Sequence, residues 1–172
     1  MKTLQELATE TRRVNGANGW GLTWKIDDLP RNVALIHSEI TEAWQERVPH
    51  KIARELGDVV IRALDLGELI RAGSFVDLEP ERLRFALVSP PSAHRNISLM
   101  ELHTLTSQVL ESFRKVKEPE AMEAAVLSGL MAVVSYAWQL MVLESQEDPA
   151  DTIDSILFVN SRRAYRHGGR RT

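Results

Sequence analysis

The sequence contains no cysteine and few aromatic residues. None of its 172 residues is cysteine, and phenylalanine, tryptophan and tyrosine together make up 6%. Without cysteine the chain has no disulfide framework, no zinc–thiolate site and no thiol nucleophile. Because proteins of a reducing compartment need no disulfides, we expect a cytoplasmic protein.

Long apolar runs are missing as well. No uninterrupted apolar stretch reaches the roughly 18 residues that a membrane span needs, and the first residues lack the apolar core of a signal sequence. The longest apolar segment, Leu127 to Leu143, is interrupted by Ser128, Gly129, Ser135 and Gln139. We expect this segment to be a buried helix, and we expect no membrane partner.

Two common classes of enzyme are excluded by motifs that the chain does not contain. It has no GxxxxGK followed by Ser or Thr, which a P-loop enzyme requires. It also has no ExxH tetrad, which a carboxylate-bridged di-iron bundle carries on two helices. No serine has a recognisable nucleophile signature.

The charges of the chain are unevenly distributed. The formal net charge is −3, but five arginines and no acid lie between residues 162 and 171, so the rest of the chain carries −8. An acidic body with a basic tail suits a small-anion site better than a nucleic-acid groove, so we expect no nucleic-acid partner.

Hydrophobic periodicity predicts an all-α fold, a helical bundle with four central helices, in a single domain that covers residues 1–172. Thr3 is the expected N-cap of the first helix, with Glu6 at the capping-box position. Helices are expected at residues 3–14, 28–48, 51–72, 98–117 and 119–144, with a shorter one at 77–88 and a last one that begins in the segment EDPADTIDSIL.

A glycine-rich loop, Asn15 to Trp24, follows the first helix. Its two tryptophans, Trp20 and Trp24, have two interpretations. Either ring is large and flat enough to stack on a nucleobase, and either can instead close the end of the bundle.

Two pairs of acids are the most informative feature of the sequence. Glu39 and Glu42 lie on one predicted helix, and Glu55 and Asp58 lie on the next. Each pair has i, i+3 spacing, so both carboxylates of a pair leave the same side of their helix. If the two helices are antiparallel, four acidic side chains converge on one point. Such a cluster suits Mg²⁺, or Mn²⁺, and a triphosphate that the ions hold.

The predicted helix 51–72 is apolar over most of its circumference. Its core side holds Ile52, Leu56, Val59, Ala63, Leu66 and Ile70. The apolar stripe of the preceding predicted helix consists of Val33, Ile36, Ile40, Ala43 and Trp44. Its one polar stripe consists of Glu55, Asp58, Arg62 and Asp65. Asp65 has two interpretations: it contacts an outer metal or the sugar of a nucleotide, or it forms a salt bridge with Arg62.

The same helix pair appears twice, at about residues 28–88 and 98–160, before a basic tail at 160–172. In this alignment His37 matches His103, a recurrence that favours packing over metal binding. Five acids have no acidic partner: Glu39, Glu42, Glu55, Asp58 and Asp65 align with Leu105, Gln108, Gly129, Ala132 and Gln139. We predict an internal duplication, a pseudo-dimer with acids only in the first copy; chance similarity of amphipathic helices is the alternative. A homodimer stays open.

At these residues the sequence resembles the MazG-like all-α nucleoside triphosphate pyrophosphohydrolases. Their EExxE motif corresponds to Ser38–Glu42, where Ser38 replaces the first Glu, and their ExxD motif corresponds to Glu55–Asp58. An NGWG segment matches Asn18 to Gly21. The closing NxxRxYRHGG pattern matches Asn160, Arg163, Tyr165, Arg166, His167, Gly168 and Gly169; a lysine that the family often carries four residues before Asn160 is Ile156 here.

The resemblance implies Mg²⁺-dependent attack of water on the α-phosphorus of a nucleoside triphosphate, with release of pyrophosphate and the monophosphate. Glu39, Glu42, Glu55 and Asp58 are the expected metal ligands, and Glu42 or Glu55 the base that orients water. The expected substrate contacts are Trp20, Asp65, Asn160, Arg163, Tyr165, Arg166, His167 and Arg170, and Gly168 and Gly169 would let backbone N–H groups approach the phosphates.

Other functions remain possible on the sequence alone. The acids can form a solvated face of a non-catalytic helical interaction module, and the arginine tail can be a disordered cationic segment. A nucleotide-binding protein without turnover is a further alternative, because Ser38 replaces an acid of the motif.

Overall fold

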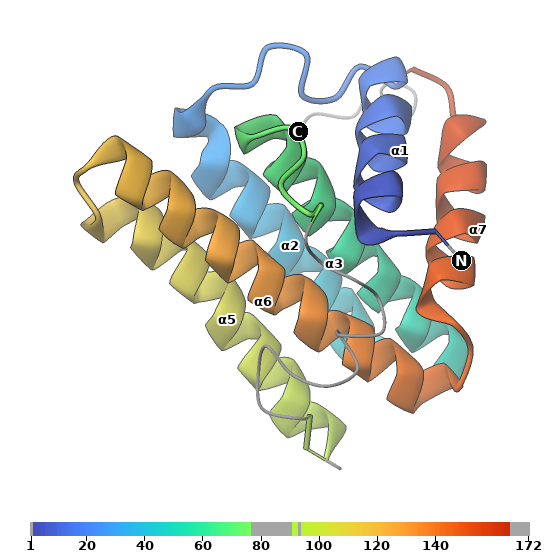
Figure 1. The fold of residues 1–172 in the computed structure, drawn as a ribbon. Helices are drawn as coiled ribbons and strands as arrows, with labels where there is room; N and C mark the ends of the chain where they lie inside the picture. Colours follow the sequence, from blue (N-terminus) through green and yellow to red (C-terminus); the bar gives the residue numbers. More distant parts are fainter. Residues whose placement is uncertain (1, 77–90, 93, 166–172) are drawn as a thin grey trace.

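The computed structural model describes residues 2–76, 91–92 and 94–165, which form an all-α fold without strands (Figure 1). The predicted fold class is therefore confirmed. The described elements are α1 (Leu4–Ala17), the short 3-10 helix η1 (Ile26–Asp28), α2 (Leu29–Gln45), α3 (Pro49–Ile70), α5 (Arg95–Lys115), α6 (Pro119–Ser145) and α7 (Pro149–Ser161).

Four helices form the core of the bundle. Helices α3 and α6 pack against each other, α2 packs on α3, α5 packs on α6, and α2 also contacts α5 (Figure 1). The apolar side chains that periodicity placed on the core side of α3, from Ile52 to Leu66, are buried, and Ile70 is partly buried. Burial of this apolar surface is the main stabilising contribution to the bundle.

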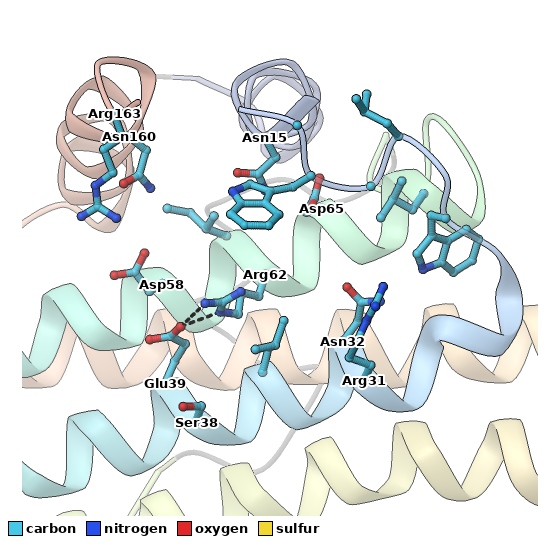
Figure 2. A pocket seen from close by; sticks show the side chains of 18 of the residues that line it. Asn15, Arg31, Asn32, Ser38, Glu39, Asp58, Arg62, Asp65, Asn160 and Arg163 are labelled. Atoms are coloured by element: carbon cyan, nitrogen blue, oxygen red, sulfur yellow. Dashed lines mark hydrogen bonds and ion pairs between the residues drawn. The ribbon is translucent and has the colours of Figure 1, made fainter. Parts of the chain in front are cut away.

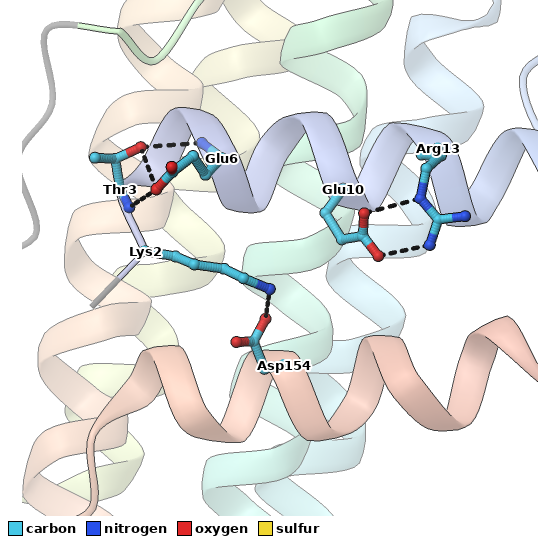
Figure 3. A network of polar contacts seen from close by, with 6 residues as sticks. All are labelled: Lys2, Thr3, Glu6, Glu10, Arg13 and Asp154. Carbon is cyan, nitrogen blue, oxygen red and sulfur yellow. Dashed lines mark hydrogen bonds and ion pairs between the residues drawn. The ribbon is translucent and has the colours of Figure 1, made fainter.

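Helices α1 and α7 both pack on α3 and lie beside each other (Figure 1). The predicted capping box starts α1: Thr3 Oγ1 accepts from the Glu6 backbone N–H at 3.1 Å, and Glu6 Oε2 accepts from the Thr3 N–H at 2.7 Å (Figure 3). Just before it, Lys2 reaches Asp154 on α7 with Nζ 2.7 Å from Oδ1. These contacts fix where α1 begins relative to α7.

Several details differ from the sequence-based expectation, and one expected helix lies outside the described residues. Helix α2 ends at Gln45 instead of near residue 48, and α5 begins at Arg95 instead of near residue 98. Helix α1 continues to Ala17 instead of ending near residue 14, because Asn15 bonds to Asp65 of α3 and Gly16 is tolerated in a final turn. Trp44 is 50% exposed, since it lies roughly 60° from the centre of the apolar stripe of α2. The short helix expected at 77–88 falls in the segment outside the description.

Helix α6 is the most apolar element. By length and composition it is able to cross a membrane, with a mean hydropathy of 1.8 over its most apolar window, but 67% of that window is buried inside the bundle. The core helix of a soluble protein has the same properties. The expectation that residues 127–143 belong to a buried helix agrees with this arrangement.

The two helix pairs are in contact between α3 and α6 and between α2 and α5, and two histidines lie at the second of these contacts. His37 of α2 and His103 of α5 stack with ring centroids 4.9 Å apart and an interplanar angle of 15°, and their Nδ1 atoms are 2.6 Å apart. A residue contacts its own counterpart only at the axis of a two-fold arrangement. This contact agrees with the predicted packing role of the histidines; the duplication itself stays a prediction.

Candidate functional site

A polar cavity of about 750 Å³ opens between α2, α3, the loop after α1 and the end of α7 (Figure 2). Its lining includes five carboxylates and four guanidiniums, so it is strongly polar. The lining residues that carry these charges are Glu39, Glu42, Glu55, Asp58, Asp65, Arg31, Arg54, Arg62 and Arg163. The whole polar stripe of α3 predicted from the sequence faces this cavity.

Three of the predicted metal ligands lie close together. Glu39, Glu42 and Glu55 each place one carboxylate oxygen within 4.8 Å of the other two. Glu39 is buried, Glu55 is half-buried and Glu42 is exposed. Asp58, the fourth predicted ligand, lines the same cavity one turn farther along α3 but is not part of this triad. The hairpin of α2 and α3 thus brings both acidic motifs to one place.

Burial and mutual repulsion make these acids hard to ionise. Burial, together with the nearby charges of Glu39 and Glu55, raises the pKa of Asp58 to about 7. The pKa of Glu55 is raised for the same reasons, burial first and then Glu42 and Glu39. A cation in the cavity would relieve this repulsion and favour the ionised forms.

Arg62 provides one such positive charge from the protein itself. Its Nε donates to Glu39 Oε1 at 2.5 Å, and its Nη2 is 2.5 Å from the same oxygen (Figure 2). The sequence placed Arg62 on the polar stripe of α3 but suggested Asp65 as its salt-bridge partner, and that pairing was wrong. Arg62 lies one turn before Asp65 on the same helix, yet it turns toward the buried acid on α2.

Asp65 pairs instead with Arg12 of α1. Arg12 Nη1 is 2.7 Å from Asp65 Oδ1, and Arg12 Nη2 donates to the backbone carbonyl of Trp20. Burial raises the pKa of Asp65 to about 6, although Arg12 and Asn15 oppose the shift. Arg12 connects α3 to the glycine-rich loop, and no signal in the sequence pointed to it.

The far wall of the cavity belongs to α7. Figure 2 shows Asn160 and Arg163 directed toward Asp58 from the opposite side. Asn160 is 9% exposed, and its Oδ1 is buried with no hydrogen-bond partner among the described residues. Gly57 allows this approach, because a Cβ there would lie 2.7 Å from Ile156 Cδ1 on α7. Ile156, the position at which the MazG-like family often has lysine, is a packing residue here.

The two stretches that resemble the family outside the acidic helices meet in space. Asn18 Nδ2 donates to the Asn160 carbonyl at 2.9 Å, across 142 residues of sequence. The Tyr165 ring lies against Gly19, where an added Cβ would fall 2.4 Å from Tyr165 Cζ. Gly19 also has φ +86, a conformation that favours glycine. The NGWG segment and the described part of the closing pattern, residues 160–165, are thus in direct contact.

The remaining predicted substrate contacts are only partly described. Trp20 and Trp24 both line the cavity, as stacking on a base would require. Trp24 also packs on the hydrophobic core, as closing the end of the bundle would require. Ser38 lines the cavity next to Glu39. Arg166, His167, Gly168, Gly169 and Arg170 lie outside the described residues.

The oxygen donors of the cavity fit a hard divalent cation. An octahedral Mg²⁺ with bonds of about 2.1 Å places its ligand oxygens roughly 3 to 4 Å apart. The triad oxygens lie within 4.8 Å of one another, which approaches this spacing, and the Glu42 side chain is exposed. The arginines around the triad provide charge-assisted donors for phosphate oxygens.

No family model, curated protein or solved structure matches this chain. Its family therefore stays a prediction that depends on the motif residues. The site depends on the geometry of the cavity.

Proposed function

We propose that this chain is a Mg²⁺-dependent nucleoside triphosphate pyrophosphohydrolase related to the MazG-like enzymes. Water would attack the α-phosphorus, the bond to the bridging oxygen of the β-phosphate would break, and pyrophosphate would leave the nucleoside monophosphate. The observation that carries the proposal is the convergence, in one cavity, of three carboxylates from α2 and α3 with Asn160 from the last turn of α7 and Arg163 just after it.

The acids of the hairpin would hold the metal. Glu39, Glu42, Glu55 and Asp58 offer oxygen donors, the ligands that Mg²⁺ prefers. When bound, the ion would neutralise phosphate charge and lower the pKa of a coordinated water. Glu42 or Glu55 would accept a proton from the attacking water, and both are more accessible than the buried Glu39.

The opposite wall would hold the triphosphate. Arg163 faces Asp58 across the cavity and would form charge-assisted hydrogen bonds to phosphate oxygens. The unpartnered Oδ1 of Asn160 would accept a hydrogen bond from the substrate or its water. Trp20 would contact the base, and Asp65 the sugar, at the α1 end of the cavity. Tyr165, Arg166, His167 and Arg170 are included because of the resemblance.

The decisive test is pyrophosphate release from a panel of canonical and damaged nucleoside and deoxynucleoside triphosphates with Mg²⁺ or Mn²⁺. The matched variant is Glu55→Gln, which keeps size and removes charge. Wild-type turnover on at least one nucleotide, lost in Glu55→Gln, would support the proposal. Absence of turnover across the panel would refute it as an enzyme.

A nucleotide-binding protein without turnover is the second candidate. It is favoured by Ser38, which lines the cavity at the position of the first acid of the family motif. Calorimetric titration with a non-hydrolysable triphosphate and Mg²⁺ separates the two candidates. Binding without pyrophosphate release identifies the binder. If the protein neither binds the triphosphate nor releases pyrophosphate, the helical interaction module is the function that is left. For such a module, millimolar Mg²⁺ would not shift the melting temperature.

A further inference from the structure

Two arginines form ion pairs with acids of the cavity, and they differ in how firmly they are held. Arg12 bonds both to Asp65 and to the Trp20 carbonyl, and its side chain is 22% exposed. Arg62 has Glu39 as its only hydrogen-bond partner among the described residues, and its side chain is 37% exposed. The Arg12 guanidinium is thus held by two different partners, whereas the Arg62 guanidinium is held by one carboxylate oxygen and is released when it leaves that oxygen.

Arg62 is bound to the least exposed carboxylate of the acidic triad. The Glu39 side chain is 10% exposed, and two nitrogens of Arg62 lie 2.5 Å from its Oε1. A guanidinium at this distance occupies the electrostatic position of a bound cation. Because like charges repel, a divalent ion beside Glu39 and the Arg62 guanidinium on Glu39 Oε1 disfavour each other.

We propose that Arg62 is an internal counter-ion of the acidic triad, which a divalent cation must displace from Glu39. The inference rests on the metal site of the proposed function and adds a residue outside its set of ligands. The cavity is built for a ligand on independent grounds, because the buried Asn160 Oδ1 lines it and lacks a partner among the described residues. Arg62 thus compensates one of the three negative charges of the triad, and its release accompanies metal binding.

The experiment measures Mn²⁺ binding to the full chain by calorimetry and by electron paramagnetic resonance, without nucleotide. The variant is Arg62→Gln. The control is Arg54→Gln, which removes a second cavity arginine on α3; its charge also acts on Glu55 and Asp58, but it forms no described ion pair with an acid of the triad. We expect Arg62→Gln to bind Mn²⁺ about three- to tenfold more tightly than wild type, and Arg54→Gln to change affinity less than about twofold.

Thermal melts provide the second readout. Without metal, Arg62→Gln should melt at a lower temperature than wild type, because Glu39 loses its counter-charge. With saturating Mn²⁺ the order should reverse or the difference disappear. A purely structural salt bridge would instead lower the melting temperature equally in both conditions, and that result would overturn the proposal.

Other outcomes separate the two proposals. The displacement of Arg62 by the cation is overturned if Arg62→Gln binds Mn²⁺ no more tightly than wild type, or if Arg54→Gln gains as much Mn²⁺ affinity as Arg62→Gln. Either result leaves the proposed metal site itself intact. If wild type does not bind millimolar Mn²⁺, the metal site fails, and the displacement fails with it. Should Arg62→Gln not fold, Arg62→Lys decides: it keeps the charge without the forked contact and should also bind Mn²⁺ more tightly than wild type.

Discussion

The two helix pairs of the bundle have similar architecture and opposite chemistry. In α2 and α3 the polar positions hold acids that face a cavity. In α5 and α6 the aligned positions hold uncharged residues, and Gly129 stands where the first pair has Glu55. A Cβ at Gly129 would lie 2.9 Å from Val109 Cγ2, so α5 and α6 are in direct contact there. The first pair lines the cavity, whereas the described residues of the second pair pack against their neighbours and do not line it.

The difference shows that a helical hairpin does not make a pocket by itself. The cavity exists because the loop after α1 and the end of α7 cover α3 from the other side. Acids on a hairpin without such a cover would be solvated and would repel each other weakly. Covered by α1 and α7, the same acids are partly desolvated, which raises the pKa of Asp58 and Glu55.

The largest expected effect is on pyrophosphate release, which should depend on the acids of α2 and α3 and not on the aligned residues of α5 and α6. Replacing Glu39 or Asp58 with alanine should lower Mg²⁺-dependent pyrophosphate release by at least about a hundredfold, since each would remove an oxygen ligand of the proposed metal site. Gln108→Ala, at the position aligned with Glu42, should change the rate less than about twofold. Circular dichroism should report unchanged helicity in all three. Normal turnover in both acid variants would refute their assignment.

The next effect concerns stability without metal. Asp58→Asn should stabilise the metal-free protein at pH 8 by about 1–3 kcal/mol, because the pKa of Asp58 is raised to about 7 by burial. The raised pKa means that wild type gains stability as the pH falls through 7, so the advantage of Asp58→Asn should shrink toward pH 4. Urea unfolding in EDTA measures both.

The counterpart change should act with the opposite sign. Ala132→Asp places a lone carboxylate at the aligned position in α6, where no cavity arginine compensates it, and should destabilise the protein at pH 8. Equal effects of Asp58→Asn and Ala132→Asp would mean that the two pairs have the same electrostatic environment, contrary to the comparison.

A smaller effect tests the cover itself. Gly19→Ala should cost about 1–2 kcal/mol, because alanine at φ +86 is strained and its Cβ would collide with the Tyr165 ring. Gly73→Ala is the matched control: its φ is +81, but a Cβ there meets no described atom within 4 Å. It should cost about half as much, and equal costs would argue against the Tyr165 contact.

The smallest effect concerns the stacked His37 and His103, which belong to one of the contacts between the two helix pairs. Burial lowers the pKa of both His37 and His103, and for His37 the neighbouring His103 lowers it further. A lowered folded-state pKa means that stability falls as the pH drops below about 6.5. Replacing both histidines with asparagine should remove this loss of stability at low pH. Because solvent screens these half-buried groups, the free energy of unfolding at pH 5 should change by less than about 1 kcal/mol. Unfolding curves between pH 7.5 and 5 that keep the wild-type slope would contradict this.

Much of the fold could be predicted because local periodicity dominates an all-α chain. The buried side of α3 and the capping box at Thr3 both follow from spacing along the sequence. The grouping of Glu39, Glu42 and Glu55 could also be predicted, since a short connection makes neighbouring helices antiparallel. These features need only near-neighbour information.

The ion pairs could not be predicted in the same way. Arg12 reaches Asp65 across 53 residues, and Arg62 turns to Glu39 across 23 residues. Both pairings depend on side-chain direction within a cavity whose shape is set by three other segments. Spacing limits which side of a helix a residue lies on, but it does not choose between two acids on that side.

The bond between Asn18 and the Asn160 carbonyl has a consequence for how the chain matures. All the acids of the cavity belong to the first 65 residues, yet the wall that covers them is contributed by residues 160–165. On the ribosome, the acidic hairpin emerges before residues 160–165 are synthesised. A nascent chain that stops short of residue 160 would therefore have more hydrated carboxylates, and its cavity would be complete only once these residues are added.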